Sequence, residues 1–143
     1  MLYKNKTTLV LLRLLLISVA AAASSDGGEI IRKLIHVEVV NMLPPGHSFG
    51  IHCKSKDDDL GNHIVGPNQR YGFEFRDNFL GTTLFFCGVK TEYGEGVYEI
   101  FTHRRDEDRC SRCVWGVTQV GVYGYSKGLN ALPDIYFKWK GLP

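Results

Sequence analysis

Four cysteines are the residues whose type and spacing constrain the chemistry of this chain most. They are Cys53, Cys87, Cys110 and Cys113. They could form two disulfides, a zinc site, or a redox Cys-x-x-Cys pair. Structural zinc usually draws on two close ligand pairs, and only one close pair is present here. A redox pair would require a thioredoxin-like, cytosolic setting, whereas this chain begins with a secretory signal, described below. We therefore expect two disulfides.

The alternation of side chains along the expected strands favours one pairing of these cysteines. Cys53 shares a strand face with two apolar residues, and Cys113 shares a face with Trp115. Both cysteines would then point into the core, where a bridge between two sheets beside a buried tryptophan is typical of β-sandwiches. The pattern predicts Cys53–Cys113 and leaves Cys87 for Cys110. The other two pairings remain open, because a slip of one residue reverses a strand face.

A hydrolytic or ribonucleolytic site is the alternative that the remaining reactive residues suggest. Gly46, Ser48 and Gly50 have the spacing of the nucleophile elbow of α/β-hydrolases, which requires a turn from a strand into a helix. Here a strand pattern follows instead. Two histidines could supply the acid and base of a ribonuclease, but no spacing brings any two together. The histidines are His36, His47, His52, His63 and His103. We expect no catalytic residues.

Two charged segments are candidates for contact with a partner. The acidic run at residues 57–59 fails as an EF-hand loop, because Gly61 and Asn68 fall at the wrong positions, and it is typical of a solvated turn. A β-sandwich calcium loop is its alternative. The run at residues 104–109 is a mixed-sign loop that could serve solubility alone. Both runs lie close to cysteines, which would hold them in place at low entropic cost. The candidate contact residues are Asp57, Asp58, Asp59, Arg104, Arg105, Asp106, Glu107 and Asp108. We expect neither a metal nor a cofactor.

The first 23 residues have the features of a secretory signal peptide. Lys4 and Lys6 precede an apolar stretch, and four alanines at 20–23 fit the pocket of signal peptidase. The apolar stretch is too short to span a membrane. We expect cleavage at Ala23–Ser24, which leaves a single domain at residues 24–143 and no membrane span.

The composition and charge of the remaining chain exclude several classes of protein. Over the full sequence of 143 residues, a hydrophobic fraction of 44% with 22% charged residues excludes a disordered chain. The signal carries three basic residues and no acid, so 14 basic and 15 acidic residues remain. A chain so balanced has no overall attraction to nucleic acid or anionic lipid, and we expect no nucleic-acid partner.

The elements that must position these residues are β-strands. Apolar residues recur with a period of two in six short segments separated by turns. Residues 82–89 are nearly continuous apolar or β-favouring sequence, residues 97–102 complete a hairpin after the turn signal at 92–96, and no long helical pattern occurs. This predicts an all-β fold, a small antiparallel β-sandwich of about eight strands. The expected strands are residues 35–39, 49–53, 71–75, 82–89, 97–102, 113–117, 121–125 and 135–139. Residues 57–61 are expected to form a turn and 104–109 a loop.

Three segments, at residues 52–61, 79–87 and 109–117, together resemble the plant self-incompatibility protein family, also called S-protein homologues. The four cysteines, Trp115 and the Gly-x-Tyr-x-Tyr run at 121–125 also match, and the resemblance covers about residues 35–125. Two features depart from the family pattern. Val120 stands where an acid is expected, and the only glycosylation sequon begins at Asn5, within the signal.

The resemblance implies a small, secreted plant β-sandwich that is not an enzyme. Its founding member is a stigma-secreted determinant that signals to incompatible pollen, and most other members resemble general secreted ligands. The leading hypothesis is therefore a non-enzymatic ligand that binds a receptor or membrane protein on a plant cell surface, acting as a monomer. The alternatives are the hydrolase or ribonuclease above and a carrier of a small apolar molecule, which would require a large internal cavity.

Overall fold

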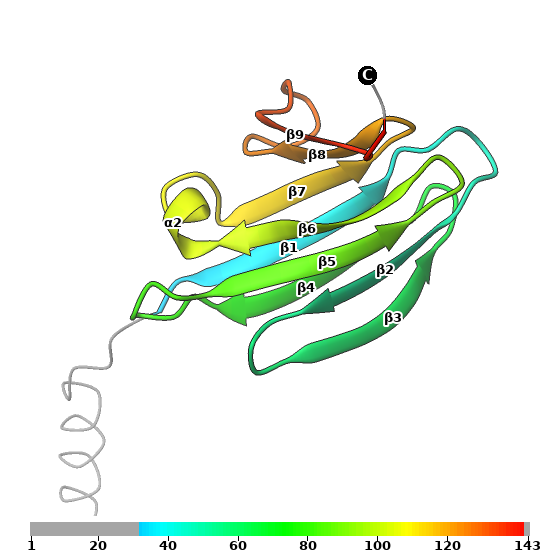
Figure 1. The fold of residues 1–143 in the computed structure, drawn as a ribbon. Helices are drawn as coiled ribbons and strands as arrows, with labels where there is room; N and C mark the ends of the chain where they lie inside the picture. Colours follow the sequence, from blue (N-terminus) through cyan, green and yellow to red (C-terminus); the bar gives the residue numbers. More distant parts are fainter. Residues whose placement is uncertain (1–31, 142–143) are drawn as a thin grey trace, which may run out of the picture. The chain divides into compact units, whose positions relative to one another are not determined.

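A computed structural model describes residues 32–141 as two packed β-sheets (Figure 1). The five-stranded sheet has the order β4-β1-β7-β8-β9, and the four-stranded sheet has the order β3-β2-β5-β6. The strands are β1 (Leu34–Asn41), β2 (Phe49–Lys54), β3 (Asp59–Val65), β4 (Arg70–Arg76), β5 (Leu84–Lys90), β6 (Glu95–Thr102), β7 (Arg112–Val117), β8 (Gly121–Tyr125) and β9 (Ile135–Lys138). One short helix, α2 (His103–Asp106), follows β6. The signal peptide expected at residues 1–23 lies outside the described residues.

The predicted all-β sandwich is confirmed, and eight of its nine strands match the expected segments. The ninth, β3, is not among the expected strands, and its first three residues belong to the segment 57–61 that the sequence predicts to be a turn. Its sequence contains Gly61 and several polar residues, so it lacks the alternation that marks a half-buried strand. It lies at the edge of its sheet and pairs only with β2 along its length, so one face and one edge remain open.

One strand pair departs from the expected antiparallel arrangement. β1 and β7 are parallel neighbours, with Val37 opposite Cys113 and Val39 opposite Trp115. The chain leaves the four-stranded sheet at the end of β6, passes through α2, and enters the other sheet between β1 and β8 (Figure 1). Parallel neighbours need such a crossover connection, because a tight turn joins only antiparallel strands.

Side chains fill the space between the two sheets. The largest fully buried ones include Trp115, Phe49 and Phe101. Trp115 stacks on Phe137 with 5.5 Å between ring centroids, and Phe85 contacts the rings of β4 from the opposite sheet. Burial of this apolar and aromatic surface is the main stabilising contribution to the fold. The packing gives no support to the carrier hypothesis, which requires a large internal cavity.

All four cysteines form disulfides, as expected, but the expected pairing is wrong. The bonds are Cys53–Cys87 and Cys110–Cys113. Cys53 and Cys87 are direct partners on the neighbouring strands β2 and β5, with 4.0 Å between their Cα atoms. Cys113 faces the core from the other sheet. Alternation placed Cys53 and Cys113 on core-facing sides but could not reveal the register that places Cys87, which also faces the core, opposite Cys53.

Candidate functional site

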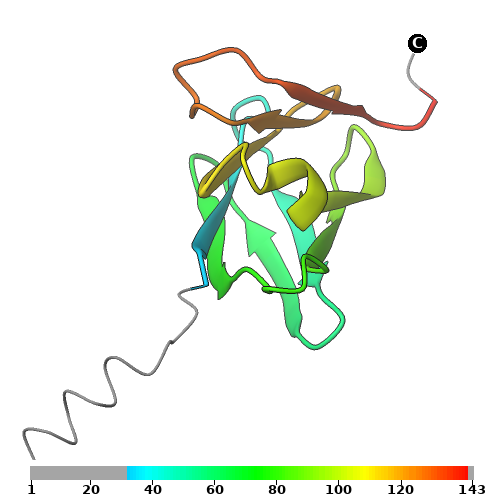
Figure 2. The ribbon, with the colours of Figure 1, turned by 90° about the vertical axis from the view of Figure 1, so that its left-hand side faces the viewer.

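Three connections meet at one end of the sandwich, which we call the loop end. They are the β2–β3 turn (residues 55–58), the β4–β5 loop (77–83), and α2 with its following loop (103–111), and Figure 2 views this end directly. A cavity of about 560 Å³ lies between the first two, lined by Asp57 and Asp58 on one side and Thr82 on the other. The fold therefore brings together both segments predicted to contact a partner, and places between them a loop that the sequence analysis did not predict to contact a partner.

The β4–β5 loop is held by hydrogen bonds centred on Asn78. Its side-chain oxygen accepts a bond from Leu80 N at 2.7 Å, and its own backbone N donates to Thr83 Oγ1 at 2.7 Å. Gly81 has φ of 71° and lies so close to His103 that a Cβ would approach the ring at 3.1 Å. An asparagine that closes a turn and a glycine at positive φ are standard devices for fixing a tight loop.

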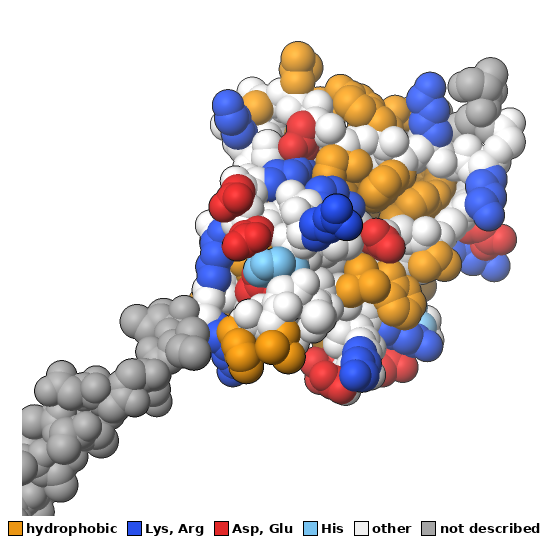
Figure 3. Space-filling view, turned by 60° about the vertical axis from the view of Figure 1, so that its left-hand side comes forward, with side chains coloured by type: hydrophobic (Ala, Val, Ile, Leu, Met, Phe, Trp, Pro, Cys, Tyr) orange, Lys and Arg blue, Asp and Glu red, His pale blue; other side chains and the backbone are white. Residues whose placement is uncertain are grey.

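This loop exposes two large apolar side chains. Phe79 is 68% and Leu80 is 69% exposed. Hydrophobic side chains gather in several exposed groups on the side of the molecule that Figure 3 turns toward the reader. Two adjacent exposed apolar residues on a loop held by hydrogen bonds can bury their surface against a partner at little ordering cost.

His103 links α2 to the β4–β5 loop. Its Nδ1 lies 2.6 Å from Asp77 Oδ2, and its Nε2 lies 3.2 Å from a carboxylate oxygen of Glu107. The hydrogen bond with Asp77 raises the pKa of His103 above its ordinary value, and the charges of Asp77, Glu107 and Asp108 add to this effect. The bond between His103 and Asp77 fastens the helix to the neighbouring loop.

The β2–β3 turn presents its acidic side chains to solvent. Asp57, Asp58 and Asp59 are all exposed, as expected. Ser55 N donates to Asp58 O at 2.8 Å, and Asp58 N donates to Ser55 Oγ, which fixes the turn. Asp59 already begins β3, and its carboxylate lies 2.5 Å from His52 Nε2. The hydrogen bond with His52, helped by one from Gly61 N, lowers the pKa of Asp59.

The second charged segment is not the exposed loop that the sequence predicts. Its first part forms α2, whose N-cap Thr102 accepts a hydrogen bond from Arg105 N. Arg104, Glu107 and Asp108 are exposed, and Arg105 is half-buried. Asp106 is completely buried, so its prediction as a contact residue is wrong.

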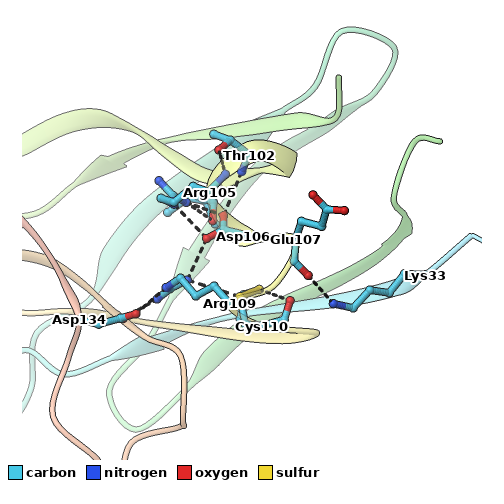
Figure 4. Close-up of a disulfide and its surroundings, with 10 residues drawn as sticks. Lys33, Thr102, Arg105, Asp106, Glu107, Arg109, Cys110 and Asp134 are labelled. Atoms are coloured by element: carbon cyan, nitrogen blue, oxygen red, sulfur yellow. Dashed lines mark hydrogen bonds and ion pairs between the residues drawn. A yellow bond between two sulfur atoms is a disulfide. The ribbon is translucent and has the colours of Figure 1, made fainter. Parts of the chain in front are cut away.

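Asp106 is buried because it is the centre of a polar network (Figure 4). Its two oxygens accept bonds from Arg105 at 2.9 and 2.7 Å, from Arg109 at 3.1 Å, and from Thr102 N at 3.0 Å. Arg109 also forms a two-pronged bond to Asp134, with both distances 2.7 Å. A carboxylate can be buried only when charged and polar partners satisfy it in this way.

The two arginines of this network also cover the core tryptophan. The guanidinium carbons of Arg105 and Arg109 lie 5.4 and 5.6 Å from the ring of Trp115. Cation–π contacts of this kind stabilise the position of the arginines. Together with the Cys110–Cys113 bond, this network fixes the position at which the chain enters β7. The role of the network is therefore structural, because it holds α2 and the loop after it in place at the loop end.

The residues considered for catalysis are not assembled into a catalytic set. Ser48 is exposed, and the Gly-x-Ser-x-Gly motif leads directly into β2. The nucleophile elbow needs a helix at this place. The five histidines lie on different elements and each has its own partner: Glu74 for His36, Glu92 for His47, Asp59 for His52, Leu60 O for His63 and Asp77 for His103. Across residues 32–141, no three His, Cys, Asp or Glu side chains are grouped to hold a metal.

Sequence reasoning missed Phe79 and Leu80 as candidate contact residues. The sequence does contain an indication of this site. Asn78 and Gly81 are residue types common in turns, and the two residues between them are apolar. In the structure both of these side chains face solvent.

The fold and the loop end define a class: a small, disulfide-bonded β-sandwich whose chemistry lies in its connecting loops. The model of the family described as plant self-incompatibility protein S1 matches residues 36–139. The chain therefore belongs to this family, and the resemblance drawn from its sequence is confirmed.

Several curated plant proteins are similar to this chain. S-protein homolog 24 of Arabidopsis thaliana is 47% identical over 80 residues, which cover 55% of this chain and 53% of that protein. Self-incompatibility protein S1 of Papaver rhoeas is 38% identical over 97 residues, which cover 66% of this chain and 70% of that protein. The chain thus spans about half the length of the first relative and somewhat more of the second.

A solved structure shares the fold. It is described as belonging to the self-incompatibility protein homologues, a widespread family of small, highly stable, secreted proteins from plants. The TM-score is 0.60 at 19% identity, over 78% of this chain and 98% of the other. Within residues 32–141 of this chain, no helix is long and apolar enough to cross a membrane.

Proposed function

We propose that this protein is a secreted, non-enzymatic signalling ligand that binds a protein on a plant cell surface through its loop end. Secretion is supported by the signal-like segment at residues 1–23 and by the description of the related solved structure as secreted. The mature protein would begin at Ser24 and act as a monomer. Mass spectrometry of secreted material tests the cleavage, and an intact Met1 would refute it.

The observation that carries the proposal is the exposure of Phe79 and Leu80 on a hydrogen-bonded loop. Their loop is fixed by Asn78 and attached to α2 through His103. Exposed charges flank it on both sides, from residues 56–58 and from Arg104, Glu107 and Asp108. Interfaces commonly combine a central apolar anchor with a polar, charged rim, and this loop end has that composition.

Binding of labelled mature protein to plant cells tests this role. We expect Phe79→Ser with Leu80→Ser to weaken saturable binding at least tenfold, because the anchor is lost. Leu132→Ser is the matched control, since Leu132 is 87% exposed elsewhere in the chain, and it should leave binding unchanged. Charge reversal at Asp57 and Asp58 should weaken binding in a salt-dependent manner. Equal binding by the loop-end variants and the control would contradict the proposal.

Assays against ester and RNA substrates test the enzymatic alternative. We expect no turnover above that of a heat-denatured sample. Turnover that disappears on Ser48→Ala, or on substitution of one histidine, would overturn the non-enzymatic assignment.

A further inference from the structure

A second surface, separate from the loop end, has the shape and charge of a binding groove. It crosses the outer face of the four-stranded sheet and has a volume of about 790 Å³. We call it the sheet groove, and it shares no lining residue with the cavity at the loop end. Four residues from adjacent strands lie in each of two rows across this face. The rows are Ile64–Gly50–Lys90–Glu95 and Asn62–His52–Gly88–Val97.

The floor of the groove is made by two glycines that the fold does not require. Gly50 and Gly88 lie on the neighbouring strands β2 and β5, away from the core. A Cβ at Gly50 would meet only Ile64 Cδ1, and one at Gly88 only His52 O, each at 3.9 Å, an ordinary contact distance. By contrast, a Cβ at Gly96 would collide with the ring of Tyr98.

Glycine within a strand weakens it, because glycine has high backbone entropy and no side chain to pack. The absence of a side chain at Gly96 is explained by packing, because a Cβ there would collide with Tyr98. At Gly50 and Gly88 a Cβ would fit, so packing does not explain why these positions are glycine. Their effect is to leave the backbone in the middle of this sheet face without side chains above it.

Apolar side chains form two walls of the groove. Ile64 on β3 is 78% exposed and Val97 on β6 is 70% exposed, and they stand on opposite sides of the glycine floor. Together they offer apolar surface to one side chain lying across β2 and β5.

The charged lining of the groove is predominantly basic. Lys90, Lys138 and Lys140 line it, against the single acid Glu95. All three lysines are exposed, and none forms an ion pair among the described residues. Lys138 and Lys140 come from the end of β9 and the residues after it, and they add positive charge on the side of β6. A groove with this lining attracts a partner that carries acidic groups.

We propose that the sheet groove binds an extended, acidic segment of a protein partner. One large apolar side chain of that segment lies over Gly50 and Gly88, between Ile64 and Val97. Its carboxylates face Lys90, Lys138 and Lys140. The ligand then has two independent binding surfaces, and the sheet groove does not depend on the role proposed for the loop end.

Selection from a display library of random twelve-residue peptides tests this groove. The mature protein is the bait, and Gly88→Val is used for counter-selection. We expect the selected peptides to combine at least two Asp or Glu with one large apolar residue. Gly88→Val should weaken them at least tenfold, and Lys90→Gln with Lys140→Gln should weaken them about as much and reduce their salt dependence. Amide NMR shifts should centre on Gly50, Gly88 and Lys90.

Two controls separate loss of the groove from loss of the fold or of the loop end. Gly88→Val should unfold at the same temperature as the parent or a higher one, because valine favours strands and its Cβ has room. Lys127→Gln and the double variant Phe79→Ser, Leu80→Ser should keep full peptide affinity.

Several outcomes would overturn the proposal. These are peptides without acidic residues, affinities unchanged by Gly88→Val, NMR shifts centred on the loop end, or no enrichment over an unrelated protein. Self-association that disappears in Gly88→Val would instead identify a second copy of this chain as the occupant, and would also overturn it.

Discussion

At the scale of single residues, Asp106 is the side chain on which the loop end depends. Replacing it with asparagine keeps the shape of the side chain but removes its negative charge. The side-chain NH2 group of asparagine would also point at N–H donors of Arg105 or Arg109, which need an acceptor at that place. Breaking a buried ion pair on one side typically costs about 3 kcal/mol or more. We expect Asp106→Asn to lower the free energy of unfolding by about that amount, measured by urea denaturation.

Asp108→Asn is the matched control for this change, two residues away and exposed. Its effect on the free energy of unfolding should stay within about 0.5 kcal/mol. If the two variants were equally stable, the network around Asp106 would contribute nothing measurable to the fold.

At the scale of elements, the two disulfides should contribute unequally. Cys53–Cys87 joins two strands across a sequence separation of 34, whereas Cys110–Cys113 has a separation of 3 and fixes the entry to β7. In the chain-entropy model these loops correspond to about 4 and about 2 kcal/mol of stabilisation. We expect removal of the first bond by Cys53→Ala and Cys87→Ala to cost more than removal of the second by the equivalent pair.

Urea denaturation of the two double variants checks this order, and non-reducing peptide mapping checks the pairing itself. A peptide containing both Cys53 and Cys113 would show the pairing described here to be wrong. A larger loss on removing Cys110–Cys113 would mean that native contacts around β7, and not chain entropy, determine its contribution.

At the scale of the whole molecule, stability should be greatest in mildly acidic solution. The pKa of His103 is raised in the folded protein, chiefly by its bond with Asp77. The contribution of His103 to folding stability is therefore fully present below about pH 6.5 and is lost as the pH rises through the raised pKa. The pKa of Asp59 is lowered, chiefly by its bond with His52, so its contribution is full above about pH 4 and is lost on further acidification.

Thermal unfolding between pH 5 and 8.5 measures this dependence. We expect a higher melting temperature at pH 5.5 than at pH 8.5, and a smaller difference in His103→Gln. His63→Gln is the control, because His63 contacts a backbone carbonyl and no carboxylate, and it should keep the full difference. A parent protein that is equally stable at both pH values would contradict the assignment.

The sequence by itself determined the features that depend on local pattern. Alternation, one continuous apolar run and one hairpin signal identified eight of the strands, and alternation placed Cys53 and Cys113 on core-facing sides. The even number of cysteines indicated two disulfides, and three segments together indicated the family. These features can be predicted because a side chain's face follows from the chain's own period of two, independent of its neighbours.

Only the tertiary structure decided which segments meet. It placed Cys87 opposite Cys53, made β1 and β7 parallel neighbours, and turned residues 59–65 into an edge strand. It also buried Asp106 beneath two arginines while exposing Phe79 and Leu80 at the loop end. Each outcome depends on contacts between residues distant in sequence. Strand register and sheet order are set by the packing of all the strands together, so local alternation does not contain them.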